Sequence, residues 1–172
     1  MALGVPWLLN PLLGAGSLLL VWRLTRDLVA DRSAPGWALL LALASPQFTV
    51  NAISFYSMPA HLFFNLLFLW LLLRRGWRTA LGAGVVGSVA LTLHNPVPHL
   101  VFAPPWILWL CLERRAWRRG LALLAGYLPL SVVLGIGWLL VRSAVAGGEG
   151  AAEGGLTAIV ASFTGAFRLP VL

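Results

Sequence analysis

The side chains best suited to chemistry in this chain are histidines and amides grouped around two proline-containing turns. At one turn His94, Asn95 and His99 surround Pro96 and Pro98. At the other, Tyr56 and His61 lie on either side of Pro59. Imidazole and carboxamide groups can donate hydrogen bonds to phosphate or hydroxyl oxygens. Both turns interrupt long apolar stretches, where polar groups need a cavity, a partner or the interface. We therefore expect a polar pocket for an anionic head group, or two turns that simply lie in a wet interface. The pocket residues, as candidates for donor or phosphate binding, are His94, Asn95, His99, His61 and Tyr56, joined by Asn51 and Gln47.

The five carboxylates are poorly placed for catalysis next to those turns. Asp27, Asp31 and Glu113 accompany arginines, whereas Glu149 and Glu153 lie in a glycine-rich stretch. A general base must be held within hydrogen-bond reach of its substrate, and glycine-rich chain is flexible. The sequence therefore identifies no catalytic residue. It predicts no metal site either, because the three histidines lack close ligand spacing.

The composition places these residues in a membrane protein. Of 172 residues, 60% are hydrophobic and 10% are charged, whereas soluble domains have about 45–50% apolar and about 25% charged residues. The net charge is +7, and every basic residue is arginine. Because the arginines form short clusters between apolar stretches, we expect them to set membrane topology and not to bind nucleic acid. The single cysteine, Cys111, cannot form an internal disulfide.

The apolar intervals predict an all-α, polytopic membrane helix bundle. A spanning helix needs roughly 20 apolar residues, which gives about six transmembrane helices joined on the outer side by short turns containing proline. We place a transmembrane domain at 1–142, a glycine-rich outer loop at 143–155 and an interfacial or re-entrant, truncated segment at 156–172. The expected spans lie near 2–22, 37–54, 59–73, 79–93, 97–112 and 120–141.

Ten of the twelve arginines fall in the first, third and fifth loops of this arrangement. Cytoplasmic loops carry the excess of positive charge. We therefore expect a multi-pass protein of the cytoplasmic membrane, with membrane lipids as partners and with both termini and all three histidines on the outer side. The ten arginines are Arg23, Arg26, Arg32, Arg74, Arg75, Arg78, Arg114, Arg115, Arg118 and Arg119.

A glycine pattern at 82–87 matches the dinucleotide-binding string but lacks its context. It follows an arginine cluster instead of a strand, and no acidic residue lies about 20 positions further on. Small residues also let helices approach closely. We expect Gly82, Gly84 and Gly87 to pack against a neighbouring helix.

Several short motifs, in order along the chain, resemble the membrane glycosyltransferases of the GT-C fold. The resemblance is to the protein O-mannosyltransferase and aminoarabinose-transferase relatives, often described as family 39-like. It extends over nearly the whole chain. The motifs are Asn10-Pro11, Arg23 to Asp27, Ala44 to Phe48, and Tyr56 to Met58 with His61, followed by the arginine-flanked, glycine-rich helix that ends at Pro96.

This resemblance implies an enzyme that transfers a sugar from a polyprenyl-phosphate donor to a lipid, glycan or protein acceptor on the outer face. In such enzymes an acidic residue in the first outer loop acts as base or holds a divalent metal ion. We expect that residue upstream of Met1, so that this fragment is inactive without the remainder of the enzyme. His61 matches the family's Ser-His turn, and His94-Asn95 replaces a common Arg-Pro pair. The alternative is a non-catalytic lipid-binding, transport or scaffold protein, which needs no missing carboxylate.

Overall fold

The computed structural model describes residues 8–53, 57–93, 97–112 and 116–145, and within these ranges every regular element is an α-helix. This confirms the all-α fold class. The chain divides into two units, Met1–Ser131 and Val132–Leu172, and the contacts below belong to the first. The helices are α1 (Leu9–Leu28), α2 (Ala34–Ala44), α3 (Pro46–Ile53), α4 (Met58–Leu73), α5 (Trp77–Thr92), α6 (Val97–Leu112) and α7 (Trp117–Val145).

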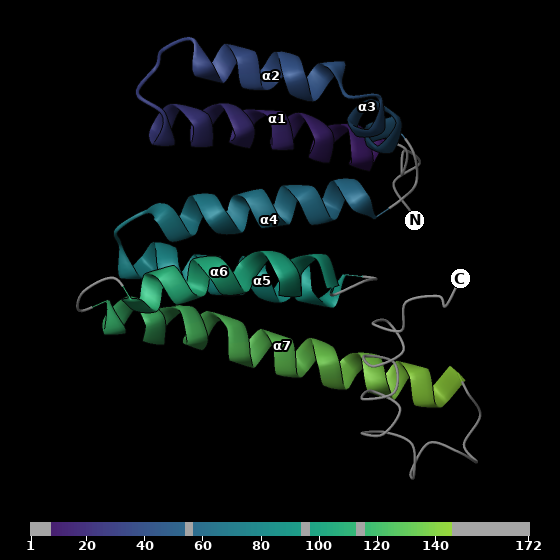
Figure 1. Cartoon of the computed structure of the whole chain (residues 1–172). Helices are drawn as coiled ribbons and strands as arrows, with labels where there is room; N and C mark the ends of the chain where they lie inside the picture. The colour runs from purple at the N-terminus through teal and green to yellow at the C-terminus, as the bar shows by residue number, and fades with distance from the viewer. Residues whose placement is uncertain (1–7, 54–56, 94–96, 113–115, 146–172) are drawn as a thin grey trace, which may run out of the picture. The chain divides into compact units, whose positions relative to one another are not determined.

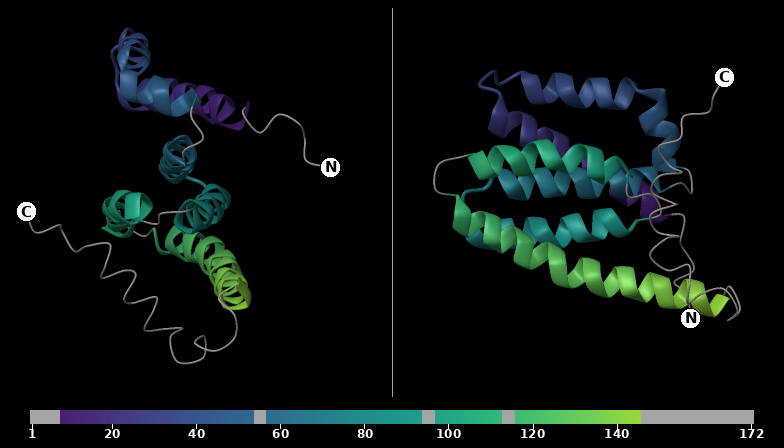
Figure 2. Two further views of the ribbon diagram at one scale, coloured as in Figure 1. Left: turned by 90° about the vertical axis from the view of Figure 1, so that its right-hand side faces the viewer. Right: turned by 60° about the horizontal axis from the view of Figure 1, so that its bottom comes forward.

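Successive helices of the first unit run back and forth, so that the loops alternate between two ends (Figures 1 and 2). The connections after α1 and α4 and the start of α7 lie at one end. The C-termini of α3 and α5 and the N-termini of α4 and α6 lie at the other end. Helix α4 packs against α1, α5 and α6, while α2 packs on α1. We call the two ends the arginine end and the histidine end, after the side chains that each contains.

The expected single span at 37–54 is divided into two helices, α2 and α3, which meet at a bend of 68°. The residue types explain the break. Ser45 accepts a hydrogen bond on its side-chain oxygen from the backbone N–H of Phe48 at 3.3 Å, as a helix N-cap does. Pro46 follows as the first helical residue, where its missing N–H costs nothing. The structure therefore has seven helices in the described residues, where six were expected.

Helix α1 also extends further than expected, through Arg23 and Arg26 to Leu28. These arginines lie on its last turns and not in a loop. There their positive charges interact favourably with the C-terminal end of α1, which is the negative end of the helix dipole.

Close contact between α5 and α7 depends on glycine, as the motif at 82–87 predicted. A Cβ atom added to Gly84 would collide with the backbone of Leu123 and Gly126, and one added to Gly126 would collide with the backbone of Leu81. A Cβ at Gly87 would collide with the ring of Tyr127. The packing role of Gly84 and Gly87 is confirmed.

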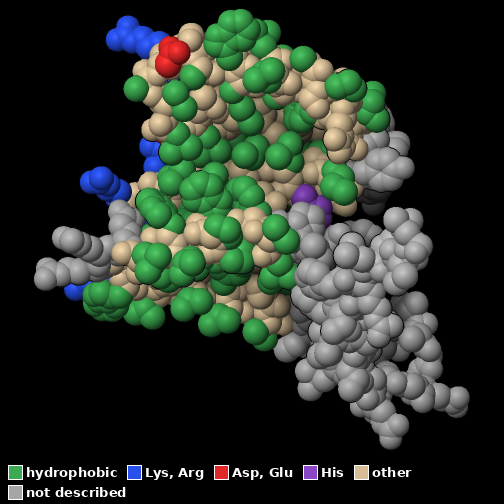
Figure 3. All heavy atoms as spheres, viewed as in Figure 1, with side chains coloured by type: hydrophobic (Ala, Val, Ile, Leu, Met, Phe, Trp, Pro, Cys, Tyr) green, Lys and Arg blue, Asp and Glu red, His purple; other side chains and the backbone are tan. Residues whose placement is uncertain are grey.

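The apolar core of this unit is small, and much apolar surface faces outward. The core cluster comprises Phe68, Leu72, Ala83, Ala103, Leu110 and Leu123. Leucines, valines and tryptophans remain exposed along all of the helices that surround it (Figure 3), whereas Ser17, His61, Asn65, Ser88 and His99 are buried. Among the described residues, no helix is both long and apolar enough to cross a membrane by itself, although α2 and α3 together meet that test across their bend.

At the arginine end, charged side chains tie the helix termini together. Arg74 forms a 2.8 Å ion pair with Asp27 of α1. Arg119 donates hydrogen bonds to the carbonyl oxygens of Leu72 and Arg74 at 2.6 and 3.0 Å, at the C-terminus of α4. In the loop before α2, the backbone N–H and the hydroxyl of Ser33 both donate to Asp31 and hold the pKa of its carboxyl below the usual value.

Candidate functional site

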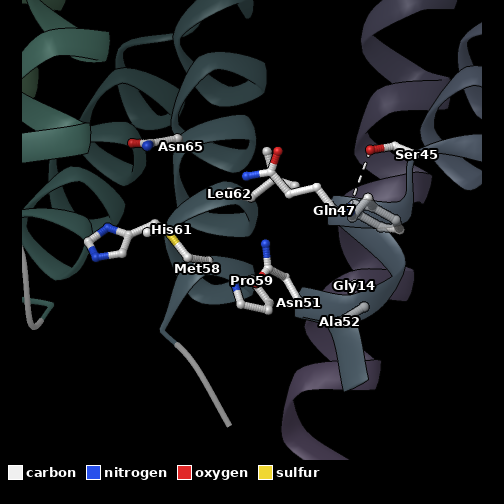
Figure 4. A pocket seen from close by; sticks show the side chains of 11 residues that line it. Gly14, Ser45, Gln47, Asn51, Ala52, Met58, Pro59, His61, Leu62 and Asn65 are labelled. Atoms are coloured by element: carbon white, nitrogen blue, oxygen red, sulfur yellow. Dashed lines mark hydrogen bonds between the residues drawn. The ribbon is translucent and has the colours of Figure 1, made fainter. Parts of the chain in front are cut away.

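A pocket of about 390 Å³ lies at the histidine end, between α1, α3 and the first turns of α4 (Figure 4). It contains three of the residues that the sequence predicted for a polar pocket, namely Gln47, Asn51 and His61. The bend at Ser45 creates it, because α3 turns away from the direction of α2 and faces α4. The remaining lining residues are Gly14, Ser45, Phe48, Ala52, Met58, Pro59, Leu62 and Asn65.

Helix α3 supplies two polar side chains of the pocket, Gln47 and Asn51. Gln47 and Asn51 are four residues apart, which places them on one face of a helix, one turn from each other. Both side chains extend from α3 toward α4 (Figure 4). Phe48 of α3 and Met58 and Leu62 of α4 also line the pocket and contribute apolar walls. Such a mixture of mainly apolar walls with a few polar groups is typical of small-molecule sites.

His61 and Asn65, although they border the pocket, direct their side chains to the other side of α4 (Figure 4). The two residues are also one helical turn apart, so they share a face of α4. Both are buried. Helix α4 therefore separates the predicted polar residues into two groups: the amides of α3 in the pocket, and a buried polar cluster.

The buried polar cluster consists of His61, Asn65, His99 and Tyr127. His99 is 1% exposed and lies in the first turn of α6, at the histidine end. Its Nδ1 atom lies 2.5 Å from Oδ1 of Asn65, and its Nε2 atom forms a short hydrogen bond with the hydroxyl of Tyr127. Phe68 packs edge-on against the ring of His99, with centroids 5.2 Å apart. These contacts join α4, α6 and α7.

The chemistry of the three groups sets the direction of these hydrogen bonds. The Oδ1 atom of Asn65 only accepts, so Nδ1 of His99 must carry a proton. In a neutral imidazole, Nε2 then accepts, and the Tyr127 hydroxyl is the donor. Such a chain satisfies both nitrogens of a buried ring, which would otherwise cost free energy. The cluster therefore holds His99 in one tautomer.

Serine hydroxyls continue the polar contacts between α5 and α7. The Ser88 hydroxyl donates to the carbonyl oxygen of Tyr127 at 2.7 Å, and the Ser131 hydroxyl donates to Ser88 at 3.0 Å. Both bonds lie at the close crossing of these helices. They fix the turn of α7 that carries Tyr127.

The other predicted site residues, His94, Asn95 and Tyr56, lie outside the described residues. Asn65 and Tyr127 were not predicted. The position of Asn65, four residues after His61, was a usable signal in the sequence, because both share a helix face. Tyr127 had no comparable signal, since its role depends on the crossing of α7 with α5.

Catalytic acids and metal ligands do not gather at this end of the described chain. Asp27 and Asp31 lie at the arginine end. Within the described ranges no three histidine, cysteine or acidic residues are close enough to hold a metal ion. The described residues therefore supply the pocket with no carboxylate base.

Comparison with known proteins gave no relative: no protein-family model, curated protein or solved structure matches this chain.

Proposed function

We propose that this chain is a membrane-embedded helix bundle that forms a segment of a glycosyltransferase, with a polyprenyl-phosphate-linked sugar as donor. The observation that supports the membrane location is the distribution of polarity. Large apolar side chains such as Leu41, Ile53 and Leu112 are exposed, while polar groups such as Ser88 and His99 are buried. A soluble monomer rarely exposes extended apolar surface. Lipid chains are the surroundings in which this arrangement is stable.

The lengths of the helices are compatible with a bilayer that adapts to them. Helices α4 and α5 have 16 residues each, or about 24 Å, and a hydrocarbon core is about 30 Å thick. Flanking arginines and tryptophans that reach the interface, or local thinning, accommodate such a difference. Trp77 and Trp117 are exposed at the arginine end, next to Arg78 and Arg118. Tryptophan is enriched at such interfaces.

The pocket at the histidine end supports the donor-binding part of the proposal. It opens between helices whose outer surfaces are apolar, which suits an amphipathic ligand with its chain in the lipid and its head among Gln47 and Asn51. The ordered motifs that resemble the GT-C enzymes include Ser45, Pro46 and Gln47, which form the bend and one wall of this pocket.

Photo-crosslinking tests this function. The chain is produced in bacterial membranes, and a polyprenyl-phosphate sugar with a diazirine near the phosphate is added. We expect the protein to stay with membranes after carbonate washing and the crosslinks to lie on α3 or the first turns of α4. Release by carbonate, or crosslinks only at the arginine end, would contradict the proposal.

A second candidate is a non-catalytic lipid-binding or scaffold protein. The observation that favours it is the absence of any acidic residue among those that line the pocket. The two candidates differ in one measurement, the release of polyprenyl phosphate from a labelled donor by membranes that contain this chain within its complete gene product. Release that is lost in a variant with Gln47→Leu and Asn51→Leu supports the transferase. Donor binding without release supports the second candidate.

A further inference from the structure

The pocket at the histidine end is walled by uncharged groups. None of its eleven lining residues is an arginine, a lysine or an acid, and its histidine, His61, directs its ring to the other side of α4. An ionised group buried among apolar walls is usually paired with an opposite charge, whereas a neutral ligand needs only hydrogen bonds. In the first unit the described arginines belong to the arginine end: on the last turns of α1 and in the loop after it, around the α4–α5 connection, and at the start of α7. Among the described residues that line the pocket, a phosphate finds no charged partner.

The polar groups in the pocket match hydroxyl groups instead. A carboxamide, as in Gln47 and Asn51, carries two N–H donors and an acceptor oxygen and can form more than one hydrogen bond, and a hydroxyl group also donates and accepts. The side-chain oxygen of Ser45 accepts a hydrogen bond from the backbone N–H of Phe48, and a hydroxyl group also has one proton to donate. Two amides one helical turn apart can therefore bind different hydroxyls of one ring.

The rest of the pocket suits the carbon skeleton of such a ring. Phe48, Met58 and Leu62 supply apolar contact area in the same pocket. The volume of about 390 Å³ lies within the range of about 300–1,000 Å³ that is typical of small-ligand sites. A flat C–H face of a sugar packs on such walls while its edge is hydrogen-bonded.

We propose that this pocket binds the neutral sugar of a glycolipid, through hydrogen bonds from its hydroxyls to Gln47 and Asn51, while the phosphate of a lipid-linked donor lies outside it. This inference rests on the proposed function and refines it. It also replaces the anionic head group expected from the sequence. Specificity for the sugar then depends on α3, whose orientation depends on the bend at Ser45.

The experiment uses the full chain in lipid nanodiscs and three probes that share one alkyl chain: hexyl β-glucoside, hexyl phosphate and hexanol. Binding is followed by the side-chain amide NMR signals of Gln47 and Asn51. We expect the glucoside to shift both signals and the other two probes to leave them unchanged. Gln47→Leu and Asn51→Leu should each weaken glucoside binding about fivefold to tenfold, the effect of one lost hydrogen bond.

Thr49→Val is the matched control. Thr49 belongs to the same helix, but its hydroxyl bonds to the carbonyl oxygens of Leu43 and Ser45 and it does not line the pocket. This variant should bind the glucoside as the parent chain does. Equal loss in Thr49→Val would mean that α3 has unfolded and would overturn the assignment to the two amides.

The remaining outcomes separate this inference from the proposed function. Shifts with hexyl phosphate but not with the glucoside would overturn the neutral-sugar assignment and leave a lipid-phosphate pocket standing. Equal shifts with hexanol and the glucoside would overturn it as well, because only the alkyl chain would then be recognised. If no probe shifts the signals, the pocket binds neither group, and both this inference and the donor pocket fail.

Discussion

At the scale of single residues, the hydrogen bond from Tyr127 to His99 is the most informative. Tyr127→Phe removes the donor that satisfies Nε2 of the buried ring. We expect unfolding to become easier by about 1–2 kcal/mol, since a buried acceptor is left without its partner. Thermal unfolding in detergent, followed by circular dichroism, measures this. The ¹⁵N shifts of His99 should also change, because the bond no longer holds one tautomer.

Thr92→Val provides the comparison for Tyr127→Phe. The Thr92 hydroxyl donates only to carbonyl oxygens of its own helix, those of Ser88 and Val89, and the side chain is exposed. Loss of this hydroxyl should change the free energy of unfolding by at most about 0.5 kcal/mol, as is usual for a surface substitution. A Tyr127→Phe effect no larger than this one would mean that the cluster is not satisfied as described.

Asp31 provides a residue-scale prediction about pH. Its pKa is lowered, first by the backbone N–H of Ser33 and then by the Ser33 hydroxyl. A carboxyl with a depressed folded-state pKa stabilises the fold above its unfolded pKa, and this contribution is lost as the pH falls through the folded value. Ser33→Ala removes one donor and should move the pKa upward, as measured by carboxyl ¹³C titration. An unchanged or lower pKa would contradict the role of the hydroxyl.

The sequence was informative about which residue types matter and less informative about their partners. It pointed to Gln47, Asn51 and His61, which border one pocket, and to His99, which is buried in the polar cluster. It did not separate the two groups, because only the position of α4 decides which side chains face α3. Residue type and helical spacing can be read from a short stretch of sequence. The pairing of His99 with Tyr127 cannot, because it depends on how α4, α6 and α7 pack together.

At the scale of elements, the glycine crossing of α5 and α7 sets how closely these helices approach. Gly84→Ala and Gly126→Ala would each place a Cβ atom into the backbone of the other helix. We expect each variant to lose about 1–3 kcal/mol of stability, the usual cost of overpacking. Gly120→Ala is the control, because it lies in α7 with nothing within 4 Å of the added atom. It should stabilise the helix by up to about 1 kcal/mol.

The three glycine variants are compared by thermal unfolding in the same detergent. Similar stability in Gly84→Ala and Gly120→Ala would mean that α5 and α7 do not approach through Gly84. At this scale the sequence predicted helix type and the glycine contact, because both follow from local pattern. It missed the break between α2 and α3, because counting apolar residues ignores the cap formed by Ser45 and Pro46.

At the scale of the whole molecule, the distribution of arginines leads to a prediction of sidedness. Ser33 directly precedes α2, at the arginine end, and Ser57 directly precedes α4, at the histidine end. Cytoplasmic loops carry the positive charge, so the proposed membrane location requires these two residues to lie on opposite sides, with Ser57 outside. The predicted sidedness follows from the distribution of arginines along the chain. The packing of the helices adds that the two groups of loops lie at opposite ends of one bundle.

Cysteine labelling checks this sidedness, and the chain is convenient for it because Cys111 is its single cysteine and is exposed. In a Cys111→Ser background, Ser57→Cys should react with a membrane-impermeant maleimide in intact cells. Ser33→Cys should react only after the membrane is opened, and the background alone should not react. Equal reaction of both variants in intact cells would contradict a membrane-spanning bundle. Reaction of Ser33→Cys alone would invert the topology and place the pocket on the cytoplasmic side, where an outer-face sugar donor cannot reach it.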